Sequence, residues 1–71
     1  MKYDIEITSV DDRKKMVAEI WRGDYLIAEI NQEKGDIQIE VYVNGTNSSV
    51  ELNYDAFLEA LVKGKKMLLN F

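Results

Sequence analysis

The sequence contains no cysteine and no histidine among its 71 residues. Without them the chain cannot form a disulfide framework, a zinc finger or a catalytic centre based on thiol or imidazole chemistry. Proline is also absent, and no linker or repeat divides the chain. We therefore predict a single domain over residues 1–71, small enough to bury only about 60% of the surface that its unfolded chain exposes.

Two further absences bear on location and partners. Residues 1–6 alternate between charged and apolar side chains, unlike a signal peptide, and no run approaches the ~18 apolar residues of a membrane span. We therefore expect a cytoplasmic protein. Basic residues are not in excess either, because the net charge is −4. This charge argues against nucleic acid or an anionic membrane surface as a partner.

The residues that are present predict a globular protein built largely from strands. Apolar residues make up 46% of the chain, and up to residue 53 they tend to recur at every second position, as in strands with one buried face. Residues 32–35 predict a loop in which Gly35 takes a positive φ, and residues 44–49 predict a turn. The predicted strands cover residues 3–8, 16–21, 25–31, 36–43 and 50–52.

The periodicity changes to that of a helix after residue 53. Asn53 can cap a helix, and Asp55 places a negative charge in its first turn. The predicted helix runs from about Asn53 to Leu69, with its inner face at Phe57, Leu61, Gly64 and Leu68. Gly64 either lets the helix approach the sheet closely or is a tolerated defect. The fold class is therefore α+β, an antiparallel β-meander of four to five strands with one C-terminal helix packed on one face.

The pairing of the strands follows from keeping the apolar side chains together on the helix side. A three-residue loop at 22–24 pairs Ile20 with Leu26 and Ala18 with Ala28. A two-residue turn at Gly23-Asp24 would break this agreement, so we predict the longer loop. With a loop at 32–35, Ala28 then pairs with Ile39.

The opposite, open face is predicted to be acidic and aromatic. The expected rows place Trp21 beside Tyr25 and Tyr42, and Glu19 beside Ile27 and Glu40, with no basic group on this face. Residues 16–53 carry seven acidic and two basic residues, a net charge of −5. The aromatic side chains have two explanations. They are either cross-strand pairs that stabilise a solvated sheet by ~0.2–1 kcal/mol each, or anchors for a basic protein partner. The candidate partner-binding residues are Glu19, Trp21, Tyr25, Glu29, Glu40 and Tyr42.

Catalysis and metal binding are not favoured by these residues. Glu19 could pair with Glu29 or Glu40 as an acid and a base, but an open sheet face would not desolvate them or separate their pKa values. No Asp-x-Asp-x-Asp-Gly calcium loop is present, and the charged turn at residues 11–15 neutralises itself. We therefore predict no catalytic residue, no metal and no cofactor.

Four segments carry a resemblance to a known group of proteins: Val17–Ile20, Ala28–Glu33, Ile37–Tyr42, and Phe57–Leu61 followed by Lys63, Lys65 and Leu68. Together they resemble small bacterial immunity proteins encoded beside contact-dependent growth inhibition toxins and related polymorphic toxins. The resemblance implies a cytoplasmic protein that binds one toxin domain, frequently a nuclease, and blocks it. A basic toxin domain is then the expected partner of the acidic face. The alternative is a self-associating structural or regulatory module, in which the same face or a sheet edge forms a homodimer.

Overall fold

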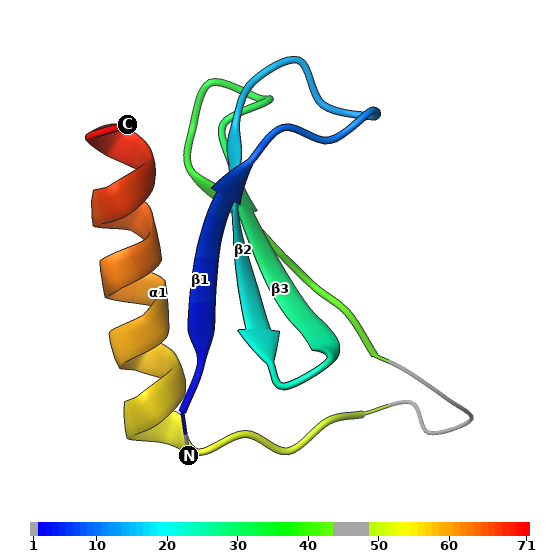
Figure 1. Ribbon diagram of the computed structural model, residues 1–71, viewed down its shortest axis with the longest axis vertical. Coiled ribbons are helices and arrows are strands. Elements are labelled where there is room, and N and C mark those ends of the chain that lie inside the picture. The colour runs from blue at the N-terminus through cyan, green and yellow to red at the C-terminus, as the bar shows by residue number, and fades with distance from the viewer. Residues whose placement is uncertain (1, 44–48) are drawn as a thin grey trace.

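The computed structural model describes residues 2–43 and 49–71, and these form one antiparallel sheet and one helix (Figure 1). The order along the sheet is β1-β2-β3-β4, so the predicted meander and α+β fold class are confirmed. The helix begins after Asn53, whose side-chain Oδ1 accepts a hydrogen bond of 2.9 Å from the Ala56 amide, as an N-cap does. The elements are β1 (Asp4–Thr8), β2 (Val17–Arg22), β3 (Tyr25–Asn31), β4 (Gln38–Val41) and α1 (Tyr54–Leu69).

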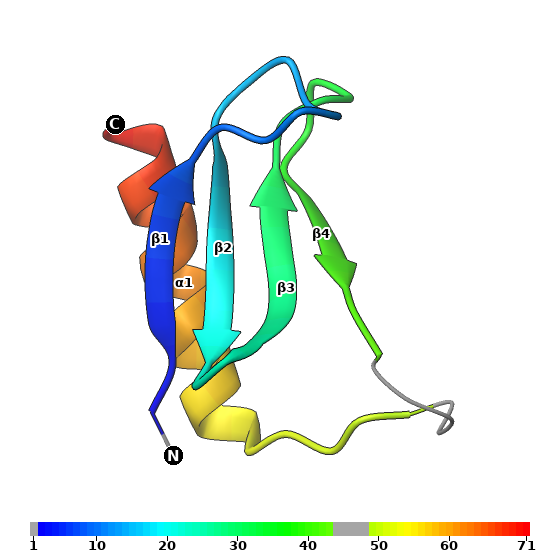
Figure 2. The ribbon, with the colours of Figure 1, turned by 45° about the vertical axis from the view of Figure 1, so that its right-hand side comes forward.

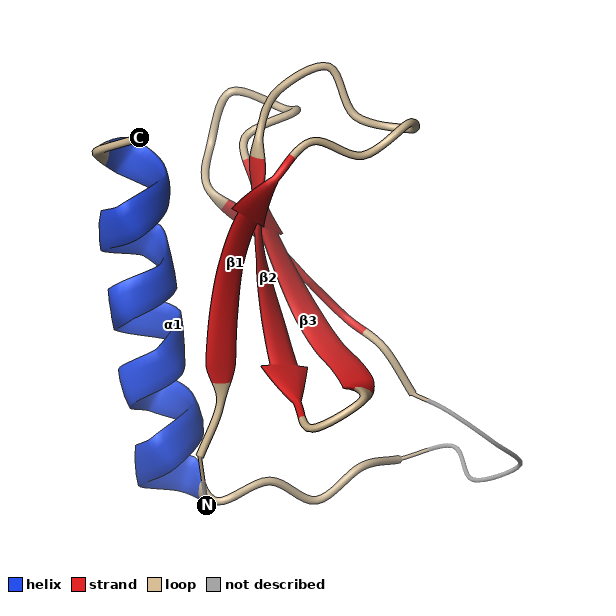
Figure 3. Ribbon diagram, viewed as in Figure 1, coloured by secondary structure: helices blue, strands red, loops and turns tan. Residues whose placement is uncertain are grey.

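The molecule has two layers, with α1 on one side of the sheet (Figure 3). The helix packs against β1, β2 and β3, and β4 lies at the edge of the sheet beyond it (Figure 2). The connection between β1 and β2 reaches to the opposite side of the sheet from α1 (Figure 1). The sheet therefore has one face covered mainly by α1 and one open face over which the β1–β2 connection folds.

The turn between β2 and β3 differs from the prediction. Arg22 pairs with Tyr25, so the turn has two residues, and Gly23 takes a φ of +60° that a residue with a side chain rarely adopts. Ile20 pairs with Ala28 but Trp21 pairs with Leu26, which leaves Ile27 as an extra residue on β3. This β-bulge shifts the pairing by one position. It keeps Ile20, Ala28 and Ile30 in the core despite the short turn and adds Ile27 to that core, whereas Leu26, expected opposite Ile20, lies opposite Trp21.

The pairing of β3 with β4 is displaced by two residues from the prediction. Ala28 pairs with Val41 and Ile30 pairs with Ile39, because the β3–β4 connection is longer than the four residues expected. Gly35 lies in this connection with a φ of +88°, as predicted. A shift of two preserves the faces, because side chains alternate with a period of two. Residues 50–52 do not form the predicted fifth strand, and most of the turn predicted at 44–49 lies outside the described residues.

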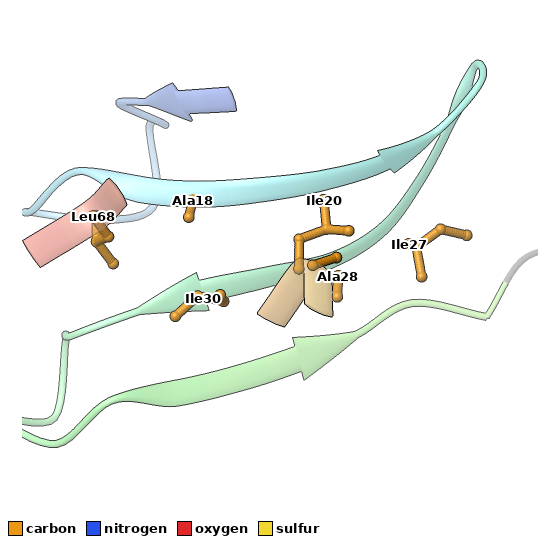
Figure 4. Close-up of a cluster of buried hydrophobic side chains, with 7 residues drawn as sticks. Ala18, Ile20, Ile27, Ala28, Ile30 and Leu68 are labelled. Carbon is orange, nitrogen blue, oxygen red and sulfur yellow. The ribbon is translucent and has the colours of Figure 1, made fainter. Parts of the chain in front are cut away.

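The core lies between the sheet and α1 (Figure 4). Ile20 and Ile30 are among the largest side chains that are fully buried, and Ala18 and Ala28 are buried in the same cluster. Phe57 and Leu61, by contrast, are only partly buried at its margin. Truncating Ile20 or Ile30 is therefore expected to cost more than truncating Phe57 or Leu61.

Gly64 is where the helix comes closest to the sheet. The residue is buried, and a Cβ added there would lie 2.9 Å from Ile30 Cδ1 and 3.8 Å from Ala18 Cβ. The first distance is shorter than a normal contact between carbon atoms. Of the two interpretations of Gly64, the structure therefore supports the close approach. The small side chain of Ala18 serves the same purpose from the strand.

Candidate functional site

The open face of the sheet carries one glutamate from each strand in a continuous row. Glu6 pairs with Glu19, Glu19 pairs with Glu29, and Glu29 pairs with Glu40. We call Glu6, Glu19, Glu29 and Glu40 the glutamate row. The predicted row of Glu19, Ile27 and Glu40 is wrong, because the bulge at Ile27 brings Glu29 between the other two. Like charges directly opposite one another destabilise a sheet. Their repulsion is relieved only where a cation, from the protein itself or from a partner, lies beside them.

Part of the compensation comes from Arg13, in the β1–β2 connection. Its Nε donates to Glu29 Oε2 at 2.9 Å, and its Nη2 donates to Oε2 of Glu40. The prediction that the open face has no basic group is therefore wrong. Desolvation would lower the pKa of Arg13, but the hydrogen bond and charge of Glu29, together with the charges of Glu40 and Asp12, raise it. The guanidinium is therefore held charged over the β3–β4 half of the row.

Glu29 is buried, unlike a residue of an open face, with only 4% of its surface exposed. Besides the bond from Arg13, its Oε2 accepts a bond of 3.1 Å from Asn31 Nδ2, and Asn31 is itself buried. A buried carboxylate needs such partners, because its desolvation is costly. In the free protein Glu29 is therefore held by Arg13 and Asn31, and little of it is exposed on the open face.

Glu33 links the β3–β4 connection to the β1–β2 connection. Its two carboxylate oxygens accept hydrogen bonds from the backbone amides of Lys14 and Lys15 at 2.9 and 3.0 Å. These bonds favour the charged form, so the pKa of Glu33 lies below its ordinary value of 4.5. The β1–β2 connection is thus held over the open face by Glu33 and by the bonds of Arg13.

This contact predicts a dependence of stability on pH. Because the pKa of Glu33 is lower in the folded protein, its contribution is present above about pH 4.5 and is lost as the pH falls through the lower folded value. Glu33→Gln should therefore flatten the acid side of the stability curve, measured by urea unfolding between neutral pH and pH 3. An exposed glutamate with no such bonds, Glu51, provides the control Glu51→Gln. An unchanged acid slope in Glu33→Gln would contradict the assignment.

The other half of the row, on β1 and β2, lacks this compensation. Among the residues that the structure describes, no ion pair reaches Glu6 or Glu19. Glu19 Oε1 accepts a hydrogen bond of 3.2 Å from Trp21 Nε1, which holds the carboxylate and the indole together on one face. The negative charge open to a partner is therefore centred on β1 and β2.

A shallow hollow of about 510 Å³ lies next to this acidic half. We call it the aromatic hollow, and it is lined by Trp21, Asp24, Tyr25, Leu26 and Tyr42. The structure thus brings together the three predicted aromatic side chains, although not by the predicted pairing. Burial, followed by the charges of Glu29 and Glu40, raises the pKa of Tyr42. Tyr25, at the turn, is exposed.

Sequence reasoning missed Glu6 and Arg13 as members of this site. Glu6 had a signal, since it alternates with Ile5 and Ile7 and must lie on the open face. Arg13 had none, because it lies in a connection whose path depends on tertiary contacts. Within the described residues, no group of three or more acidic side chains is close enough to hold a metal ion, and α1 is not long and apolar enough to cross a membrane.

Comparison with models of protein families, with curated proteins and with solved structures found no match to this chain. The candidate site therefore rests on its own geometry and charge.

Proposed function

We propose that this chain is a protein-binding module that recognises a basic protein surface through the β1–β2 half of the glutamate row and the aromatic hollow. The observation that carries the proposal is the row itself. Four glutamates directly opposite one another reduce the stability of the sheet, and Arg13 compensates only the β3–β4 half. A partner that brings lysine or arginine to Glu6 and Glu19 would relieve the remaining repulsion.

The aromatic hollow supplies the second half of the recognition. Trp and Tyr are the residues that most often carry binding energy at interfaces, and Trp21 is held beside Glu19 by its hydrogen bond. When a lysine or arginine of the partner binds the carboxylates, apolar groups of the partner close to that residue would therefore contact the aromatic side chains. An interface of standard size needs about 800 Å² from each partner, which the open face and the hollow can supply together.

The resemblance to immunity proteins gives this proposal a particular partner. A nuclease toxin binds a polyanion, so its active cleft is basic. The acidic half of the row can occupy such a cleft in place of phosphates, and complementary charge accelerates the encounter. We propose that the chain neutralises a basic toxin domain in this way, in the cytoplasm and without catalysis of its own.

The test is charge reversal at Glu6, measured against a basic toxin domain, such as one encoded by a neighbouring reading frame. Glu6→Lys should slow association by about tenfold at low salt and weaken rescue of growth. The introduced lysine would repel the basic residues with which the partner approaches this position. The same change should not unfold the protein, since it replaces a repulsion opposite Glu19 with an attraction. Asp36→Lys is the matched control, because Asp36 is exposed in the β3–β4 connection and the net charge changes equally.

A second variant separates binding from stability. Glu6→Gln should raise the free energy of unfolding by about 0.2–1 kcal/mol, since it removes a like charge opposite Glu19, and should still weaken the complex. Full protection and unchanged association by both Glu6 variants would refute the acidic-row interface.

A further inference from the structure

A second surface of the molecule, on the side away from the glutamate row, is apolar and exposed. Val62 is 61% exposed on α1, and Ile39 is 52% exposed on β4. Between them lies a hollow of about 160 Å³ that Ile30, Ile37 and Leu61 also line. We call the whole region the α1–β4 surface. Its apolar residues are Ile37, Ile39, Val41, Leu58, Leu61, Val62 and Leu69.

The surface exists because the helix covers only part of the sheet. α1 packs on β1, β2 and β3, so the helix-side residues of β4 have no cover from it (Figure 2). The helix in turn carries apolar residues beyond those it buries in the core. Leu58, Val62 and Leu69 lie four and seven residues apart, which places them on one stripe of the helix. Val62 lines the hollow together with Ile39, so this stripe borders β4.

The extent of this surface suits an interface with a second copy. The largest apolar patch on a typical monomeric protein covers about 300–600 Å² and is often functional. Five of the seven side chains here are each roughly half exposed. In a two-fold dimer each copy contributes the same patch. Two such patches with their polar rims approach the ~1,200–2,000 Å² of a stable interface.

The charges along α1 indicate a second copy in antiparallel orientation. The acidic residue Asp55 lies in the first turn of the helix, and the basic residues Lys65 and Lys66 lie near its end, with Lys65 lining the hollow beside Val62. A parallel pair of helices would place like charges together. An antiparallel pair places the acidic first turn of each helix beside the basic end of the other, and it also opposes the two helix dipoles.

We propose that the α1–β4 surface binds a second copy of this chain, with the two α1 helices antiparallel and crossing between Leu58 and Val62. The two-fold axis then repeats each contact, and Leu58 of one copy packs near Val62 of the other. The apolar side chains of β4 that α1 leaves uncovered approach the same axis. Because the glutamate row lies on the opposite side of the sheet, the dimer leaves it available to a different partner.

The first measurement is the mass of the full chain by sedimentation velocity over a range of concentrations. We expect a species of twice the chain mass of 8.2 kDa that dissociates on dilution. Val62→Glu should weaken dimerisation at least tenfold while the protein stays folded, because the side chain is exposed in the monomer. Lys63→Glu is the control, since Lys63 faces the β1 side of the helix beside Lys2 and Tyr3. A wild-type chain that remains monomeric at millimolar concentration would overturn the proposal.

The second measurement determines orientation and uses the absence of native cysteine. Val62→Cys and Leu69→Cys place single thiols at two exposed positions of the same stripe. With a short bis-maleimide, Val62→Cys should give a covalent dimer. Leu69→Cys should not, because antiparallel helices carry the two copies of residue 69 to opposite ends. Efficient crosslinking through residue 69 would show a parallel pair, and failure of both thiols to crosslink would refute this interface. Neither result depends on the toxin-binding experiment.

Discussion

Replacing Ile20 with alanine is expected to lower the free energy of unfolding by about 2–5 kcal/mol. Ile20 is fully buried between the sheet and the helix, so the truncation loses apolar burial and leaves a cavity. A domain of this size has roughly 3–5 kcal/mol of stability in total. The variant should therefore be largely unfolded at room temperature, measured by circular dichroism and urea titration.

The matched control removes the same atoms from a different place. Ile39→Ala truncates an isoleucine that also lies on the helix side of the sheet but is half exposed on β4. At concentrations where the chain is monomeric, it should cost much less than Ile20→Ala. Phe57→Ala should fall between them, since Phe57 is partly buried and its ring meets that of Tyr3 edge to face, with centroids 5.8 Å apart. Equal losses in all three variants would contradict the position of the core.

Replacing Arg13 with alanine is expected to destabilise the protein clearly, although Arg13 lies in a connection. The change leaves the buried carboxylate of Glu29 without its cation, and a buried charge without a partner is costly. The loss should be smaller than for a fully buried pair, because the Arg13 side chain keeps 20% of its surface exposed. The measurement is urea unfolding at neutral pH.

A second substitution identifies the cause. Glu29→Gln in the Arg13→Ala background removes the uncompensated charge and should recover a large part of the lost stability. Lys14→Ala is the control for the connection itself, because Lys14 is exposed and contacts Glu33 through its backbone amide, which alanine retains. If Lys14→Ala costs as much as Arg13→Ala, the effect belongs to the connection and not to the ion pair.

The architecture could be predicted from local patterns. The alternation of Ile37, Ile39 and Val41 predicts a strand because side chains of a strand alternate between its faces, and that rule needs no tertiary information. The helix was predicted from its spacing and from Asn53, whose capping bond forms within four residues of sequence. The face of most strand residues followed as well, because a register shift of two changes the partner but not the face.

The pairing itself was less predictable. A two-residue turn at Gly23-Asp24 conflicts with the apolar pattern unless β3 contains an extra residue, and nothing in the local sequence of Ile27 marks it as a bulge. The apolar pattern alone therefore predicts the longer loop. The structure has the two-residue turn together with a bulge at Ile27, and Ile20, Ala28 and Ile30 are still buried under the helix.

The sequence by itself determined a small acidic α+β domain, the elements of its meander and helix, and which glutamates and aromatic residues lie on the open face, because alternation and helical spacing act over a few residues. Only the tertiary structure decided which of those residues are ion-paired or buried. Arg13 meets Glu29 from 16 positions away, and β4 escapes the cover of α1 because a single helix is narrower than four strands. Both results depend on contacts between distant segments, whose geometry no local pattern encodes.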